Sequence, residues 1–141
     1  MATSDAPSAV GLDTSVVMRL LTGEPPKQTR RAYEYLLELQ QNGQEAIVSD
    51  LVVSEAYFAL HAHYGVPKSE AVEALLDFLR AGLVAPEPGG RAIEALTAMT
   101  AAPGKPGFVD RMIHAQYLAL PAQVASFETA FRRLPNTVIL T

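Results

Sequence analysis

Cysteine is absent from all 141 residues of the chain. This absence excludes disulfide bonds, a thiol nucleophile and a cysteine-ligated zinc site. A chain without cysteine is typical of a reducing compartment, so we expect a cytoplasmic protein.

Long apolar runs are also missing, because no stretch approaches the roughly 20 residues that a membrane span needs. We therefore expect no membrane association. Residues 1–8 are mostly small and polar, with neither a basic start nor an apolar core, and they predict a flexible tail rather than a signal peptide. Hydrophobic residues make up 49% and charged residues 18%, which is typical of a globular protein, and we expect a single domain over 9–141.

Positive charge is scarce, since 11 Lys and Arg face 15 Asp and Glu and the formal net charge is -4. Proteins that hold nucleic acid through their own cations are usually basic. If this chain acts on nucleic acid, bound cations or a local cluster of basic residues must supply the positive charge. The arginines considered for phosphate contact are Arg19, Arg111, Arg132 and Arg133.

The most informative stretch runs from Val10 to Leu21. A short apolar segment, 9–12, has the character of a buried strand, and from Val16 the apolar residues recur at helical spacing up to Gly23. Asp13 lies between the two elements. An aspartate at this position is either a helix cap or a site residue, because ligands bind at the carboxyl ends of strands in open α/β sheets.

The rest of the chain alternates between short strands and amphipathic helices. Further strands are expected at 45–48, 83–85, 123–127 and 137–140. Helices are expected from Pro26 to Asn42-Gly43 and at 51–64, 69–81, 91–100, 108–120 and 128–134. Strands separated by helices predict an α/β fold with a parallel sheet that is covered on both faces.

Several acidic residues lie near the ends of these elements. Asp13 follows the first strand, Glu55 lies early in the helix after the second, and Glu128 follows the fourth, so these three are expected to converge at one rim of a parallel sheet. Generic topology does not place Asp110, which begins the helix before the fourth strand. Clustered carboxylates repel unless a cation joins them, and oxygen-only ligands suit Mg²⁺ or Mn²⁺.

Four segments of the chain resemble the PIN-domain family, and within it the VapC-type toxins of toxin–antitoxin pairs. They occur in the family's order and are 11–17 (GLDTSVV), 48–55 (VSDLVVSE), 108–115 (FVDRMIHA) and 126–131 (SFETAF). The resemblance implies a three-layer α/β/α fold with a five-stranded parallel sheet. It also implies that Asp110 lies beside the other acids.

The resemblance further implies a metal-dependent endoribonuclease that uses Mg²⁺ or Mn²⁺. Asp13, Glu55, Asp110 and Glu128 would then be the metal-binding and catalytic acids, with Ser126 orienting the site. Glu128 is one methylene longer than the family's usual Asp. The family also implies an RNA substrate, a homodimer and a small VapB-type antitoxin that blocks the cleft.

Two other functions remain open at this level. The longer Glu128 is compatible with a weakened PIN domain that binds RNA or antitoxin without cutting. A nuclease acting on a structured DNA flap is the other alternative, although the short chain has no room for a separate DNA-binding domain. Among the histidines, His61 and His63 are expected to be structural or at the surface, whereas His114 lies one turn from Asp110 and could support it.

Overall fold

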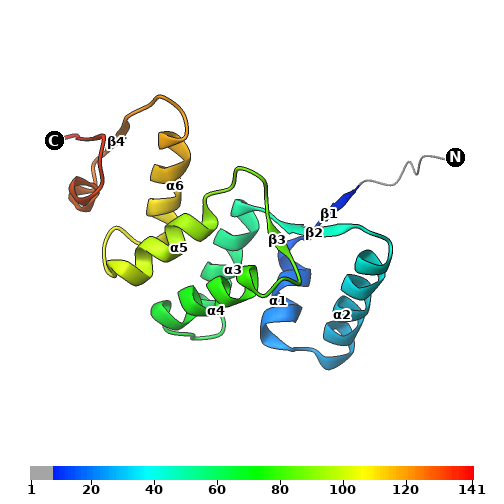
Figure 1. Ribbon diagram of the computed structural model, residues 1–141. Coiled ribbons are helices and arrows are strands. Elements are labelled where there is room, and N and C mark those ends of the chain that lie inside the picture. The colour runs from blue at the N-terminus through cyan, green and yellow to red at the C-terminus, as the bar shows by residue number, and fades with distance from the viewer. Residues whose placement is uncertain (1–7) are drawn as a thin grey trace, which may run out of the picture.

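The computed structural model describes residues 8–141 of the chain. Figure 1 shows the succession of helices and short strands. In chain order the elements are β1 (Ala9–Gly11), α1 (Thr14–Thr22), α2 (Pro26–Gln41), β2 (Glu45–Val48), α3 (Asp50–Ala62), α4 (Lys68–Arg80), β3 (Ala85–Pro86), α5 (Ala92–Ala101), α6 (Phe108–Leu118), β4 (Val124–Ser126), the 3₁₀ helix η1 (Thr129–Arg133) and β5 (Thr137–Ile139).

The strands form two parallel sheets. One sheet has the order β1-β2-β3, with Val10 paired to Ala46 and Ile47 to Ala85. The other consists of β4 and β5 alone, with Ala125 paired to Val138. The expectation of parallel strands is confirmed, but the expected single sheet of five strands is wrong for this structure.

The sheet divides because β4 and β1 lie at opposite ends of the molecule. In Figure 1, β4 and the C-terminus are at one end and β1 is near the other. We call residues 8–118 the body and residues 119–141, which carry β4, η1 and β5, the terminal segment.

The core of the body lies between the three-stranded sheet and the helices. Phe108, Leu75, Leu96, Val17 and Val48 are among its largest fully buried side chains. Burying one such side chain contributes roughly 1.5 to 3 kcal/mol.

The start of α6 is held on α3 by aromatic packing. The ring of Phe108 meets that of Tyr57 edge-on, with centroids 5.0 Å apart. An edge-to-face pair adds to the burial of both rings, so the first turn of α6 has a fixed place in the body.

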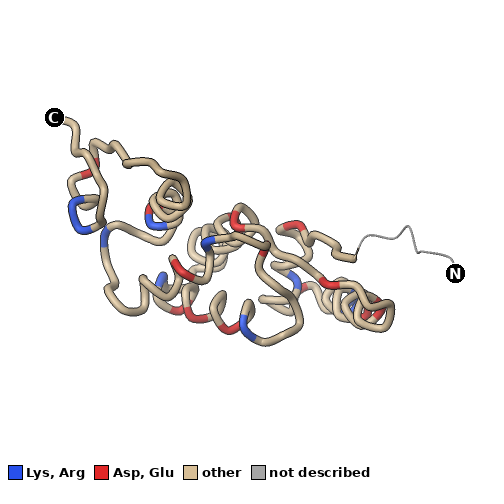
Figure 2. The backbone as a smooth tube through the Cα atoms, turned by 45° about the horizontal axis from the view of Figure 1, so that its top comes forward, with Lys and Arg blue, Asp and Glu red and all other residues tan. Residues whose placement is uncertain are grey.

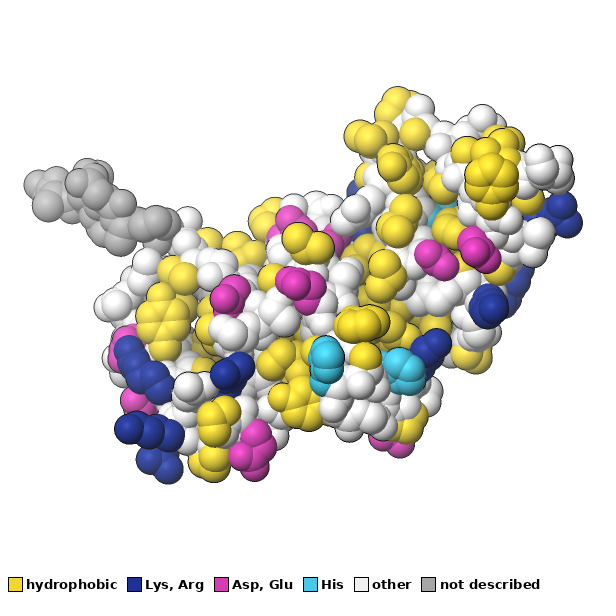
Figure 3. Space-filling view, turned by 180° about the vertical axis from the view of Figure 1, so that it is seen from behind, with side chains coloured by type: hydrophobic (Ala, Val, Ile, Leu, Met, Phe, Trp, Pro, Cys, Tyr) yellow, Lys and Arg dark blue, Asp and Glu magenta, His cyan; other side chains and the backbone are white. Residues whose placement is uncertain are grey.

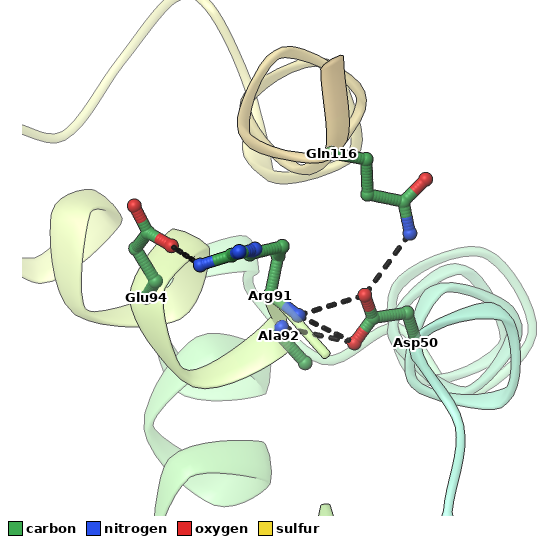
Figure 4. A network of polar contacts seen from close by, with 5 residues as sticks. All are labelled: Asp50, Arg91, Ala92, Glu94 and Gln116. Carbon is green, nitrogen blue, oxygen red and sulfur yellow. Dashed lines mark hydrogen bonds and ion pairs between the residues drawn. The ribbon is translucent and has the colours of Figure 1, made fainter. Parts of the chain in front are cut away.

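Asp50 joins three helices that are distant in sequence (Figure 4). It follows Ser49, the N-cap of α3. Asp50 is only 5% exposed, and its carboxylate accepts from the backbone N–H groups of Arg91 and Ala92 at the start of α5. Gln116 of α6 donates to the same carboxylate from 3.0 Å. Asp50 therefore caps α5 across space and anchors α6.

Position 90 is a glycine, and Asp50 and Glu87 fill the space that a side chain would need there. A Cβ at position 90 would lie 2.8 Å from Asp50 Oδ1 and 2.8 Å from Glu87 Cγ. The close approach of this loop to the buried carboxylate thus requires glycine at position 90.

The end of α5 is closed by Arg111 of α6. Its buried guanidinium donates to the carbonyls of Ala98, Ala102 and Pro106, at 3.0, 2.6 and 2.7 Å. The carbonyls of Ala98 and Ala102 lie at the C-terminus of α5, where a cation is favoured by the helix dipole, and that of Pro106 lies in the loop before α6. Burial, with Arg133 nearby, lowers the pKa of Arg111 from its ordinary value. The expectation that Arg111 contacts phosphate is therefore wrong, because backbone acceptors occupy its guanidinium.

None of the helices in residues 8–141 is both long enough and apolar enough to cross a bilayer. The expected tail falls almost wholly outside the described residues, since only Ser8 of that segment is among them.

Candidate metal centre

Asp13 caps α1 and is exposed to solvent. Its Oδ1 accepts from the backbone N–H of Val16 at 3.2 Å and from the Ser15 hydroxyl at 2.6 Å. The Ser15 hydrogen bond is the main reason that the pKa of Asp13 lies below its ordinary value, and the bond from Val16 acts in the same direction. The cap interpretation is confirmed. A role as a metal ligand is compatible with it, because both bonds end on one oxygen.

Glu55 is hydrogen-bonded to Thr14, the residue that follows Asp13. It lies exposed on α3, and its Oε1 accepts a hydrogen bond from Thr14 Oγ1 at 2.8 Å. A hollow of about 440 Å³ lies here, and Val109, the neighbour of Asp110, also lines it. The elements that carry three of the predicted acids thus border one hollow. Its full lining is Thr14, Ser54, Glu55, Phe58, Ala59, His63 and Val109.

Asp110 and Glu128 line a second and larger cavity, of about 730 Å³. Asp110 lies in the first turn of α6, and Glu128 lies at the start of η1. Lys68 and Lys105 contribute positive charge to the same walls, so this cavity combines carboxylates with cations. The remaining lining comes mainly from α3, α4, the end of α5 and the loop before α6.

Ser126 fixes the backbone at Glu128. Its hydroxyl oxygen accepts from the Glu128 N–H at 2.9 Å, which closes a local turn at the end of β4. This contact acts on the backbone of Glu128 and not on its carboxylate, so the orientation of the site by Ser126 stays a prediction.

The expected meeting of Asp13, Glu55 and Glu128 at one rim is not observed. Within residues 8–141 no group of three or more His, Cys, Asp or Glu side chains is close enough to hold a metal ion. Figure 2 shows acidic positions spread along the chain rather than gathered in one cluster. The cause is the separation of β4 from β1, which keeps Glu128 away from the end of the first strand.

Two of the arginines considered for phosphate contact, and His114, have structural partners. Arg19 donates to Gln28 Oε1 at 2.8 Å and to the Ser15 carbonyl, and Arg133 donates to the Lys105 carbonyl. Arg132 is exposed. The buried ring of His114 lies 2.6 Å from the Pro135 carbonyl, so it anchors the terminal segment.

His61 confirms the expectation of a structural role. Its Nδ1 lies 3.1 Å from the Val66 carbonyl, which tethers the end of α3 to the following loop. His63 packs its ring edge-on against Phe58 beside the smaller hollow.

The two lysines of the larger cavity were not predicted from the sequence. The signal for Lys105 was its place in the Pro103–Gly107 loop, directly before α6 and Asp110. Lys68 gave no comparable signal, because it opens α4 far from any acidic motif.

The donor set agrees with a hard divalent cation in its chemistry. Carboxylate oxygens are the ligands that Mg²⁺ and Mn²⁺ prefer, and the pKa of Asp13 is lowered, so this group stays charged at neutral pH. The acids lie in two neighbouring groups that share the first turn of α6, Asp13 with Glu55 and Asp110 with Glu128.

Comparison with known proteins gives one match. No curated protein and no solved structure matches the chain. The sequence profile of the PIN domain matches residues 10–136, a range that contains all four predicted acids and most of the described structure. A match of this extent supports a nuclease-type protein, and it shows that the chain belongs to the PIN-domain family.

Proposed function

We propose that this protein is a Mg²⁺- or Mn²⁺-dependent endoribonuclease and the toxin of a VapBC-type toxin–antitoxin pair. The observation that carries the proposal is the PIN-domain match over residues 10–136, with acids at all four positions where the sequence motifs place them. The acidic net charge agrees with it, because bound cations would then mediate contact with RNA.

Each acid has a distinct part in this proposal. Asp13, exposed and held as a carboxylate by Ser15, would provide the first metal ligand. Glu55, positioned by the Thr14 hydroxyl, would provide the second, and Asp110 would provide the third from α6. When bound, the metal would lower the pKa of a water and stabilise the leaving oxygen of an in-line displacement at phosphorus.

Glu128 and the two cavity lysines complete the proposed site. Glu128 would reach the metal either directly or through a water, from a backbone fixed by Ser126. Lys68 and Lys105 would attract the phosphates of the RNA into the cavity that they line with Asp110.

The test is cleavage of a small-RNA pool by purified, antitoxin-free protein. We expect cutting with Mg²⁺ or Mn²⁺ and none with EDTA, and we expect Asp13→Asn to abolish it. Asp77→Asn, which changes an exposed acid on α4, is the matched control and should cut like the wild type. Cutting that persists in Asp13→Asn would refute the site. Cutting of a DNA flap in preference to RNA would favour the alternative nuclease.

A second function is favoured by Glu128, whose longer arm departs from the family's usual Asp. A protein that binds RNA or antitoxin without cutting would be inert with every metal. In that case Glu128→Asp separates two explanations. Restored cutting would trace the loss to the longer arm, whereas an inert variant that still binds RNA would establish a binding protein.

The proposed partners are RNA, a small VapB-type antitoxin and a second copy of the chain. The antitoxin would bind over the acidic site and block it. Co-purification with the product of an adjacent gene, and its inhibition of cutting, would test this partnership.

A further inference from the structure

The terminal segment leaves an apolar sheet face without a cover. Ala125 and Val138 are paired across β4 and β5, so Phe127 and Leu140, two residues further on, lie on the same face. Phe127, Val138 and Leu140 are 74%, 40% and 42% exposed. Parallel strands are almost always buried on both faces, and a two-stranded sheet is marginal by itself.

A matching apolar stripe is exposed on α6. Val109, Ile113 and Tyr117 follow one another at intervals of four residues, and they are 38%, 42% and 49% exposed. Seen from behind, hydrophobic side chains gather in the hollow between the body and the terminal segment, with acidic side chains on both sides (Figure 3).

Within residues 8–141, no strand pairs with either of the two strand edges that would join the sheets. β1 is the end strand of its sheet, and β4 has only β5 beside it. Asp13 follows β1 and Glu128 follows β4, so parallel pairing of these edges would bring the two acids to the same rim.

The chain's own contacts keep β4 from its own β1. His114 meets the Pro135 carbonyl, and Arg133 donates to the Lys105 carbonyl, so the terminal segment is fastened to the side of the body away from β1. The α6 helix is itself fixed, by Arg111 on the end of α5 and by Gln116 on Asp50. A second copy can meet the free edge without breaking any of these contacts.

We propose that two copies of the chain exchange their terminal segments, so that β4 of each pairs with β1 of the other and Glu128 of one copy joins Asp13 and Glu55 of its partner. The exchange follows two-fold symmetry, so each contact is made twice. It covers the β4–β5 face and the α6 stripe, and it completes an acidic site that one copy leaves divided. The catalytic part of this inference rests on the proposed nuclease function, whereas the strand exchange does not.

The exchange is tested without activity by cross-linking, because the chain has no cysteine of its own. Gly11→Cys lies exposed in β1, where a Cβ meets nothing within 4 Å, and Ala125→Cys lies exposed in β4. The two single variants are refolded together and treated with a short bis-maleimide. We expect a covalent dimer that neither variant gives alone. A third variant carries both cysteines in one chain. Cross-linking only within that chain, or no cross-linking at all, would overturn the exchange.

Disruption of the α6 stripe gives an independent measurement of mass in solution. Ile113→Asp should convert the dimer into a monomer, as measured by light scattering, while Leu37→Asp on α2, which is 55% exposed, should leave the dimer intact. A monomeric wild type would refute the exchange. Dissociation by Leu37→Asp alone would show that the copies meet through α2 instead.

Complementation then tests the shared site. Asp13→Asn and Glu128→Gln chains are unfolded, mixed in equal amounts and refolded, so half of the dimers are mixed and each mixed dimer has one intact site. Cutting should return to about a quarter of the wild-type level, as two-fold pairing requires. Asp13→Asn mixed with Glu55→Gln should stay inactive, because both changes fall in the same copy's part of the site.

The outcomes separate this inference from the proposed function. Inter-chain cross-linking by a protein that cuts no RNA would support the exchange and reject the nuclease. Active wild type with no recovery in the mixture would support the nuclease and reject the shared site.

Discussion

At the scale of single residues, Asp13 shows that a helix cap and a proposed metal ligand can be one side chain. Its Oδ1 is engaged by Val16 and Ser15, which holds the carboxylate in a fixed orientation at the start of α1. The sequence indicated both roles and could not choose between them, because a cap and a ligand call for the same residue at the same corner.

The role of Ser15 can be measured by titration. In the wild type, the pKa of Asp13 should lie below its ordinary value of 3.8, and Ser15→Ala should raise it, because the strongest hydrogen bond to the charged form is removed. Carboxyl ¹³C chemical shifts followed against pH would report both values. Ser15→Thr, which keeps the hydroxyl, is the control, and an unchanged pKa in Ser15→Ala would contradict the assignment.

The same shift has a consequence for stability. Because the folded pKa of Asp13 is below the unfolded one, its ionised form stabilises the fold above the ordinary value of 3.8. That stabilisation is lost as the pH falls through the folded pKa. The difference in stability between wild type and Ser15→Ala should therefore be present at neutral pH and shrink in strong acid.

At the scale of elements, the junction of α3, α5 and α6 depends on one buried carboxylate. Asp50→Ala removes the acceptor for two backbone N–H groups and for Gln116, and leaves the Ala92 N–H unpaired in a buried place. We expect a loss of about 2 to 4 kcal/mol in the free energy of unfolding, measured by urea denaturation. Asp77→Ala on exposed α4 should change it by less than about 0.5 kcal/mol, and equal effects of the two variants would contradict this role.

Most of the elements were predictable because their signals are local. Hydrophobic periodicity and glycine or proline at helix ends located every helix to within a few residues, and β2 was predicted at its observed bounds. The third strand is shifted to Ala85–Pro86, and the last predicted helix is a 3₁₀ turn. The role of Asp50 was not predictable, because Ser49 beside it already explains the local cap and the partners of its carboxylate are 41 to 66 residues away.

At the scale of the whole molecule, an acidic protein that acts on RNA should depend on divalent cations for binding as well as for cutting. RNA binding must be measured without cleavage. The Asp13→Asn variant is unsuitable because it lacks a proposed metal ligand, so the wild type is measured with Ca²⁺ in place of Mg²⁺ or Mn²⁺. We expect RNA affinity, measured by fluorescence anisotropy, to fall at least about tenfold when EDTA replaces Ca²⁺, and to vary only weakly with KCl because few side-chain cations contact phosphate. Equal affinity with and without Ca²⁺ would contradict cation-mediated binding.

The arrangement of the sheets was beyond sequence reasoning. Alternating strands and helices predict parallel pairing, which is observed, but they do not specify which edges join. The candidate site was likewise predictable only in part. The acidic residues were identified from their positions, while their meeting depends on a β1–β4 contact that this chain does not make with itself.

At the junction between the body and the terminal segment, the residues that donate hydrogen bonds and the residues that accept them should differ in their tolerance to mutation. His114 and Arg133 are the side chains that hold it, and Arg111 fixes α6 within the body; the partners of all three are backbone carbonyls. Every residue type supplies a carbonyl, so side chains at the acceptor positions Ala98, Ala102 and Lys105 are free to vary as far as this junction is concerned. Substitutions should therefore accumulate at the acceptor positions of these contacts. A mutational scan should find the three donor positions intolerant of change.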